Sequence, residues 1–290
     1  MAGTSNIVKN GGVVMDAVRA ADHDRYLSAL YAPADRRDAL LALYAFNAEI
    51  AGVRDRIHEP LPGEVRLQWW RDVIAADGPE ETGHPIADAL KAAIVGNHLP
   101  KSAFDNMLEA RIFDLYDDPM PSRTDLEGYC GETAAALIQL AAMVLDPVAA
   151  PRFAELAGRA GCAQAITGLL LLLPLHRRRG QCFVPADILA AAGTTPEEFV
   201  KGEGGAAAER AVAATIALAR DHLNAFEKVA PGLPVALRPA FLPLALTRVY
   251  LDKMEKAGGS PLGSTATLST LRRHWLLLRH AMRGWTPPLT

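Results

Sequence analysis

Hydrophobic residues recur along this chain at intervals of three and four positions, the spacing that gathers them on one face of an α-helix. Alternation of apolar and polar residues, which is typical of half-buried β-strands, is missing. The positions that follow the helical spacing include Leu40, Leu43, Tyr44, Phe46, Asn47 and Ile50 in one segment, and Leu137, Leu140, Ala141, Val144 and Leu145 in another. The pattern therefore predicts an all-α fold.

Prolines divide the chain into roughly ten segments of helical pattern. No internal repeat relates these segments, so we expect one helical domain over residues 22–290, preceded by an N-terminal extension at residues 1–21. Residues 202–205 are rich in glycine and predict a loop. Residues 257–269 are rich in glycine, serine and threonine and predict a flexible connector.

Two helix starts carry capping signals. Thr195 precedes a proline and two glutamates, which suit the first turn of a helix, and Ser122 stands three residues before Asp125. Segments 134–146 and 160–175 are apolar on almost every side, which is typical of helices at the centre of a bundle. Their apolar stretches are about 13 residues long, shorter than the roughly 20 needed to cross a bilayer. We therefore expect both segments inside the domain, where a cavity between helices would form.

The charge of the chain argues against one class of function. A formal net charge of -3 provides no basic excess of the kind that a nucleic-acid-binding surface requires. The three cysteines, Cys130, Cys162 and Cys182, are widely spaced, which is typical of thiols in a reducing compartment. The first residues show the pattern of neither a secretory signal nor a transit peptide. We therefore expect a cytoplasmic protein with at most peripheral contact with a membrane.

Five short motifs follow one another over residues 22–256. They are Asp24–Pro33 with Arg36 and Arg37 behind it, Leu43–Ile50, Glu127–Ala135, Phe183–Pro185 and Leu246–Tyr250. In this order they resemble the squalene and phytoene synthase family, whose enzymes join two prenyl diphosphates head to head. The resemblance implies the isoprenoid synthase fold, a single-domain helical bundle with a central cavity. It does not by itself imply catalysis.

A second set of motifs narrows the resemblance. It consists of Tyr44–Glu49, Arg66–Arg71, Asn97–Leu99, Ala163–Thr167, Pro174 and His176, and Phe183–Pro185. This set resembles one branch of the family, that of the mitochondrial complex I assembly factor with a phytoene-synthase-like fold. The resemblance to that branch implies a role in the assembly of respiratory complex I.

The chemistry of the family needs magnesium ions, which bridge diphosphate oxygens and protein carboxylates. The resemblance implies that two Asp-x-x-x-Asp motifs supply these carboxylates, because aspartates four residues apart share one helix face. At the first motif this chain has Ala51-Gly52-Val53-Arg54-Asp55, and at the second it has the leucine-rich run 170–175. Only Asp55 survives of the first motif, and the aliphatic side chains of the second cannot hold Mg²⁺, so we expect no metal site and no cofactor.

Other acids could rebuild a metal site, and this alternative stays open. Asp114, Asp117 and Asp118 cluster before a proline, but a solvated helix end explains them as well. Glu132 could face the cavity from the helix of Tyr129. Near the amino end, Asp22 and Asp24 stand where the family often has serines, and their charge would repel a phosphate.

The candidate site residues form two groups. The residues that would line a ligand cavity are Glu49, Asp55, Tyr129, Gln164, Thr167 and Tyr250. The residues that would bind a partner or an anionic group are Arg66, Trp69, Trp70, Arg71, His176 and Arg177. Each group has a purely structural alternative, because aromatic side chains also pack in cores, threonine bonds back to its own helix and basic loops are solvated.

Two functions are open at this point. The loss of both acidic motifs favours a pseudoenzyme, a non-catalytic binding protein or complex I assembly-type factor. Its partners would be respiratory-chain assembly proteins or a lipid-like, isoprenoid ligand. The alternative is a prenyltransferase that condenses two isoprenyl diphosphates head to head, and this activity would require Mg²⁺.

Overall fold

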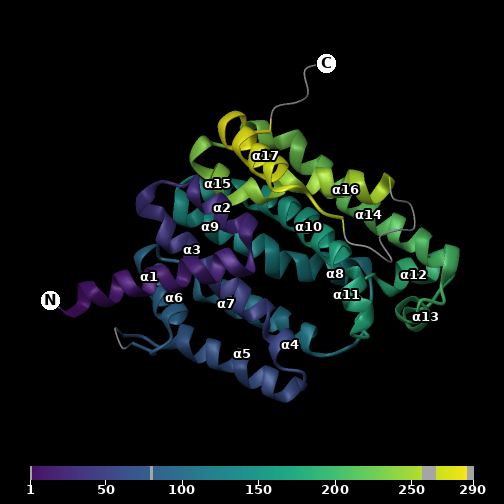
Figure 1. Cartoon of the computed structure of the whole chain (residues 1–290), viewed down its shortest axis with the longest axis horizontal. Helices are drawn as coiled ribbons and strands as arrows, with labels where there is room; N and C mark the ends of the chain where they lie inside the picture. Colours follow the sequence, from purple (N-terminus) through teal and green to yellow (C-terminus); the bar gives the residue numbers. More distant parts are fainter. Residues whose placement is uncertain (1, 79–80, 257–265, 286–290) are drawn as a thin grey trace. The chain divides into compact units, whose positions relative to one another are not determined.

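A computed structural model describes residues 2–78, 81–256 and 266–285, which form helices joined by turns (Figure 1). No β-strand occurs in these residues, which confirms the predicted all-α fold. They form 17 α-helices rather than the roughly ten predicted, because several are single turns whose few apolar residues show no period. Within the predicted loop, Gly202 ends one helix with a φ of 84°, and Gly205 begins the next. Of the predicted connector, residues 257–265 lie outside the described residues.

The chain forms two compact units, each assembled from three separate stretches. The first unit comprises Met1–Tyr116, Ala136–Ala154 and Pro234–Leu242, and the second comprises Asp117–Ala135, Glu155–Leu233 and Pro243–Thr290. The expected boundary at residue 22 falls between two helices of the first unit, and the division into an extension and one domain stays a prediction.

The first unit is organised around one helix that is covered on several sides. Its helices are α1 (Ala2–Ala21), α2 (His23–Leu30), α3 (Ala34–Ala51), α4 (Val53–Arg56), α5 (Pro60–Ala75), α6 (Pro85–Gly96), α7 (Lys101–Ile112), α9 (Ala136–Leu145) and α15 (Arg238–Phe241). Helix α3 packs against α1, α6 and α9, and α5 packs against α7. All six positions that the helical spacing singled out on α3 are buried, and so are the five on α9.

The second unit contains the longest described helix, α14. Its helices are α8 (Arg123–Cys130), α10 (Ala154–Leu171), α11 (Leu173–Arg178), α12 (Ala186–Ala192), α13 (Pro196–Lys201), α14 (Gly205–Val229), α16 (Thr247–Lys256) and α17 (Thr270–Arg283). Helix α14 lies against α12 and α16 (Figure 1). The predicted caps are present: the Thr195 hydroxyl accepts from the Glu198 amide at 3.2 Å, and the Ser122 hydroxyl accepts from the Asp125 amide at 3.2 Å.

The two apolar segments have different bounds from those predicted. The first consists of a π-helical turn at Gly131–Ala135 and then α9. The second ends at Leu171 and restarts at Leu173, because Pro174 has no amide hydrogen with which to continue the helix. By length and composition the helical run Arg123–Leu145 could cross a membrane, contrary to the sequence-based estimate of length. However, 61% of its apolar window is buried within the protein, as in a core helix.

A close approach of two backbones in the second unit provides a test of the packing. A Cβ atom added to Gly161 of α10 would lie 2.3 Å from the Ala135 amide nitrogen, whereas nothing lies within 4 Å of the same position at Gly158. We expect Gly161→Ala to lower the free energy of unfolding by about 1–3 kcal/mol through overpacking. The matched control Gly158→Ala should raise it by about 0.5–1 kcal/mol, since alanine favours helix. Urea denaturation measures both changes, and equal effects would contradict this packing.

Candidate functional site

The segment that stands at the first acidic motif joins α3 to α4 in the first unit. Arg56 donates to the backbone oxygen of Glu49 at 2.7 Å and to its carboxylate at 3.1 Å. Arg66 of α5 lies 3.7 Å from the same carboxylate. Two guanidinium groups therefore compensate the negative charge of this carboxylate.

Gly52 makes this arrangement possible. A Cβ atom at Gly52 would lie 3.1 Å from both the Arg56 Nη1 atom and the Ala48 carbonyl oxygen, so any side chain would crowd the returning arginine. Helix α3 ends at Ala51, one residue before this glycine, and Asp55 is exposed on the short helix that follows. The half-buried Glu49 and the exposed Asp55 thus belong to different helices.

Aromatic rings surround the second of these arginines. The Arg66 guanidinium lies 4.3 Å from the ring centroid of Trp69 and 5.7 Å from that of Trp70. His84 lies 5.4 Å and 5.6 Å from the same two rings. Trp70 is fully buried and meets Phe46 edge to face at 5.2 Å, whereas Trp69 is only half-buried. Of the two neighbouring tryptophans, Trp69 alone can contribute to a surface.

His84 was not singled out from the sequence, although its position before a proline indicates a helix start. Its Nδ1 atom accepts from the Ala87 amide at 3.3 Å and caps α6. Its ring orients the two tryptophans. Nearby, Arg71 pairs with Asp105 at 2.9 Å and with Glu109, so this arginine joins α5 to α7.

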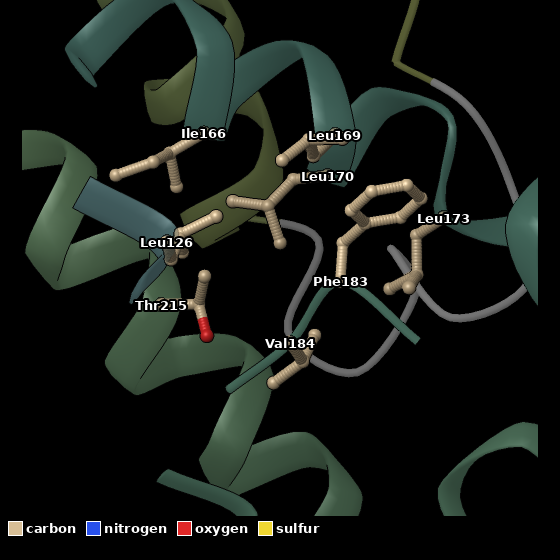
Figure 2. Close-up of a pocket in the computed structure, with 8 residues that line it drawn as sticks. All are labelled: Leu126, Ile166, Leu169, Leu170, Leu173, Phe183, Val184 and Thr215. Carbon is tan, nitrogen blue, oxygen red and sulfur yellow. The ribbon is translucent and has the colours of Figure 1, made fainter. Parts of the chain in front are cut away.

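The segment at the second acidic motif is packed with aliphatic side chains. Leu169, Leu170 and Leu173 face a small cavity in the second unit, which Figure 2 shows in close-up. The remaining lining consists of Leu126, Ile166, Phe183, Val184 and Thr215. The cavity has a volume of about 10 Å³, no more than one water molecule occupies.

The one polar side chain in this lining does not serve the cavity. The Thr215 hydroxyl donates to the Ala211 carbonyl of its own helix at 2.8 Å. In Figure 2 its oxygen points away from Leu126 and Leu170, so the methyl group faces them. The place of the second acidic motif is therefore lined by apolar side chains, and its cavity is small.

The other predicted cavity residues have partners of their own. The Thr167 hydroxyl donates to the Ala163 carbonyl at 2.7 Å, which is the structural alternative considered for it. The Tyr250 hydroxyl accepts from Arg273 at 3.3 Å. Tyr129 is half-buried with its ring 6.1 Å from that of Phe183, and Gln164 is half-buried on α10.

The basic residues after the leucine run divide between core and surface. His176 is buried, and its ring lies 4.7 Å from that of Phe183. Arg177 donates to the Phe199 carbonyl at 3.0 Å and so ties α11 to α13. Arg178 and Arg179 are exposed.

The alternative acidic cluster does not come together as a metal site. Asp114 is buried and pairs with Arg111 at 2.9 Å, whereas Asp117, Asp118 and Glu132 are exposed. Over residues 2–78, 81–256 and 266–285, no group of three or more His, Cys, Asp or Glu side chains is arranged to hold a metal ion. The balanced charge at Glu49 and the leucine packing do not suit the magnesium ions that the family's chemistry needs.

A partly buried polar pair in the second unit was missed from the sequence. His222 of α14 lies with its Nε2 atom 2.8 Å from the carboxylate of Glu127, which also pairs with Arg123 at 3.2 Å. Glu127 begins one of the family-like motifs, but its partner is 95 residues away. No local pattern in the sequence could have connected the two residues.

Comparison with known proteins identifies the class of this fold. The model of the squalene/phytoene synthase family matches residues 18–279, and the chain belongs to that family. Among solved structures, squalene synthase HpnC from Alicyclobacillus acidocaldarius superposes with a TM-score of 0.74 at 18% identity, covering 87% of this chain and 95% of that one. A dehydrosqualene synthase in complex with a ligand superposes with a TM-score of 0.76 at 15% identity, covering 95% and 96%. These two similarities concern the fold alone.

Sequence relatives point to a particular branch. The protein named NADH dehydrogenase (ubiquinone) complex I, assembly factor 6, from Bos taurus is 29% identical over 245 residues, 83% of this chain and 73% of the bovine protein. The Homo sapiens protein of the same name is 27% identical with the same coverage. Phytoene synthase 1, chloroplastic, from Arabidopsis thaliana is 25% identical over 79% of this chain and 56% of the plant protein. Both resemblances inferred from the motifs are confirmed.

The leucine packing predicts an asymmetry within one short run. Leu170 is 3% exposed and lines the cavity, whereas Leu172 is 48% exposed. We expect Leu170→Ala to lower the free energy of unfolding by about 2–5 kcal/mol, because it enlarges a cavity that the fold cannot fill. The control Leu172→Ala should cost less than about 1 kcal/mol. A neutral Leu170→Ala in urea denaturation would indicate a ligand cavity rather than packed core.

The burial of Cys182, in the segment after α11, predicts that the stability of the protein depends on pH. Burial raises the pKa of the Cys182 thiol from 9.0 to about 11. Between pH 9 and about pH 11 the thiol ionises in the unfolded chain but stays protonated in the folded one. The stability that this thiol contributes is therefore fully present below pH 9 and is lost as the pH rises through this window. We expect the free energy of unfolding to fall by about 2–3 kcal/mol more in the wild type than in Cys182→Ala over this window.

Urea denaturation at a series of pH values measures this difference. Burial also raises the pKa of Tyr44, but this tyrosine is present in both proteins and cancels in the comparison. Identical pH profiles for the wild type and Cys182→Ala would show that the thiol is not protected as the structure indicates.

Proposed function

We propose that this chain is a non-catalytic member of the squalene/phytoene synthase family that acts as an assembly-type factor for respiratory complex I. One observation carries the proposal: of the acids that the family's chemistry needs at its two motifs, this chain retains Asp55 alone, and Asp55 is exposed. Beside the first motif, Arg56 and Arg66 compensate the carboxylate of Glu49, and at the second, leucines line a cavity of only about 10 Å³. The relatives named complex I assembly factor 6 support the assembly role.

The absence of catalysis follows from electrostatics. Leaving-group diphosphate carries several negative charges, and its departure must be stabilised by metal ions or fixed positive groups. A small apolar pocket lined by Leu169, Leu170 and Leu173 offers neither hydrogen-bond donors to a phosphate nor room for hydrated magnesium. We therefore propose that the protein needs no cofactor for its function.

The proposed partners are respiratory-chain assembly proteins or a lipid-like, isoprenoid ligand. Trp69 and Arg66 offer a partly exposed aromatic and basic pair on the first unit, of the kind that anchors protein interfaces. We propose that the protein acts at the surface of the membrane that contains the respiratory chain.

The first test is chemical. We expect farnesyl or geranylgeranyl diphosphate, incubated with the purified protein and Mg²⁺, to release diphosphate no faster than without protein. An active squalene synthase serves as the positive control for the assay. Turnover that disappears in the Asp55→Ala variant would overturn the proposal and restore the prenyltransferase alternative.

The second arm of this test is genetic and separates the two parts of the proposal. Deletion of the gene should lower assembled complex I, and both the wild type and Asp55→Ala should restore it, since neither depends on catalysis. Normal complex I in the deletion strain would reject the assembly role even if the protein were inactive as an enzyme.

A further inference from the structure

Helix α17 carries an apolar stripe that faces away from the protein. Four large apolar side chains on it are exposed: Leu271 (82%), Trp275 (56%), Leu278 (46%) and Met282 (73%). Their spacing of four, three and four residues places them within an arc of about 60° on one face of the helix. Such a continuous exposed stripe is unusual on a soluble surface and marks a place of contact.

The opposite face holds α17 on the second unit. Leu276 and Leu277 are buried, and Arg273 donates to the Tyr250 hydroxyl of α16 at 3.3 Å. Two residues after the helix ends, Trp285 is buried and meets Phe226 of α14 edge to face, with the ring centroids 5.2 Å apart. The helix is therefore fixed by one face, and the exposed stripe is not a consequence of a detached segment.

The charged side chains of α17 are all of one sign. Residues Thr270–Arg283 include four arginines and no acidic residue, in a chain whose formal net charge is -3. Arg272, Arg279 and Arg283 are exposed and follow one another along one border of the apolar stripe. The Arg279 guanidinium lies 5.6 Å from the Trp275 ring, so cationic and aromatic groups meet at this border.

Arginines beside a stripe with tryptophan suit the interface of an anionic bilayer. Tryptophan prefers the headgroup level, where its ring is partly apolar and partly wet, and arginine binds lipid phosphates in a forked geometry. The helix has 14 residues, about 21 Å of length, which is less than the roughly 30 Å of a hydrocarbon core. It can therefore lie in the plane of the interface but cannot cross it.

We propose that α17 is a membrane-docking helix, which inserts its Leu271–Met282 stripe into the surface of a bilayer containing anionic lipids while Arg272, Arg279 and Arg283 bind the phosphates. This site is independent of the proposed function, because an active enzyme and an assembly factor could both dock in this way. It assigns the peripheral membrane contact to a defined surface.

The proposal is tested by vesicle co-sedimentation of the full chain. Vesicles of phosphatidylcholine alone are compared with vesicles in which about a third of the lipid is phosphatidylglycerol. We expect binding to the anionic vesicles only, weakening at high salt, because phosphate contacts between exposed charges are screened. The variant Leu271→Ser/Met282→Ser should bind at least about tenfold more weakly, since two large apolar side chains no longer enter the bilayer.

Further variants separate charge from hydrophobicity. Each of Arg272→Gln, Arg279→Gln and Arg283→Gln should lower binding roughly fivefold. The matched control is Leu61→Ser/Val65→Ser, which removes two apolar side chains of α5 that are 71% and 70% exposed but have no row of arginines beside them. This control should bind as the wild type does. Far-UV circular dichroism and the thermal transition establish that every variant is folded.

Several outcomes would overturn the proposal. They are no binding of the wild type to anionic vesicles, equal binding of the wild type and Leu271→Ser/Met282→Ser, and equal loss in the α5 control. A wild-type dimer that the Leu271→Ser/Met282→Ser variant converts to a monomer, without vesicle binding, would assign the stripe to a second copy of the chain. Binding that is equal on neutral and anionic vesicles would reject the role of the arginines.

Discussion

The structure depends on an electrostatic constraint: several negative charges can be held inside a protein only where positive charge or metal ions compensate them. In this chain the compensation is already complete without a ligand. Arg56 and Arg66 satisfy the half-buried carboxylate of Glu49, two residues before the first motif, and the leucine run at the second motif has no charge to compensate. A magnesium ion brought to Glu49 would have to displace two arginines, and one brought to the leucine run would find no oxygen ligand.

The family's fold is present in this chain although its two acidic motifs are not. Helices replace their inward polar residues by leucine at little cost to the packing, because aliphatic side chains fill space without needing partners. At Gly52, by contrast, space is tight, since a Cβ atom there would lie 3.1 Å from the guanidinium of Arg56. Membership of the family therefore accounts for the architecture, whereas the proposed lack of catalysis follows from a few substituted positions.

Helix α17 has two faces with different roles: one packs on the second unit, and the other is exposed to a binding partner. One face is fixed by Leu276, Leu277 and the bond from Arg273 to Tyr250, and the other presents apolar and basic groups outward. A fixed helix loses little conformational freedom when it binds, which favours docking of the preformed surface. Docking of this kind would bring an assembly factor close to the membrane proteins on which it acts.

The sequence by itself determined the all-α class, the buried face of α3, the caps at Thr195 and Ser122, and the loss of the acidic motifs. These features are local, because helical periodicity, capping and motif spacing are properties of neighbouring residues. Only the tertiary structure decided that Arg66 reaches Glu49, that Trp70 is buried while Trp69 is not, and that His222 meets Glu127. These pairings join residues far apart in the chain, and their geometry is set by how helices pack, which no local pattern encodes.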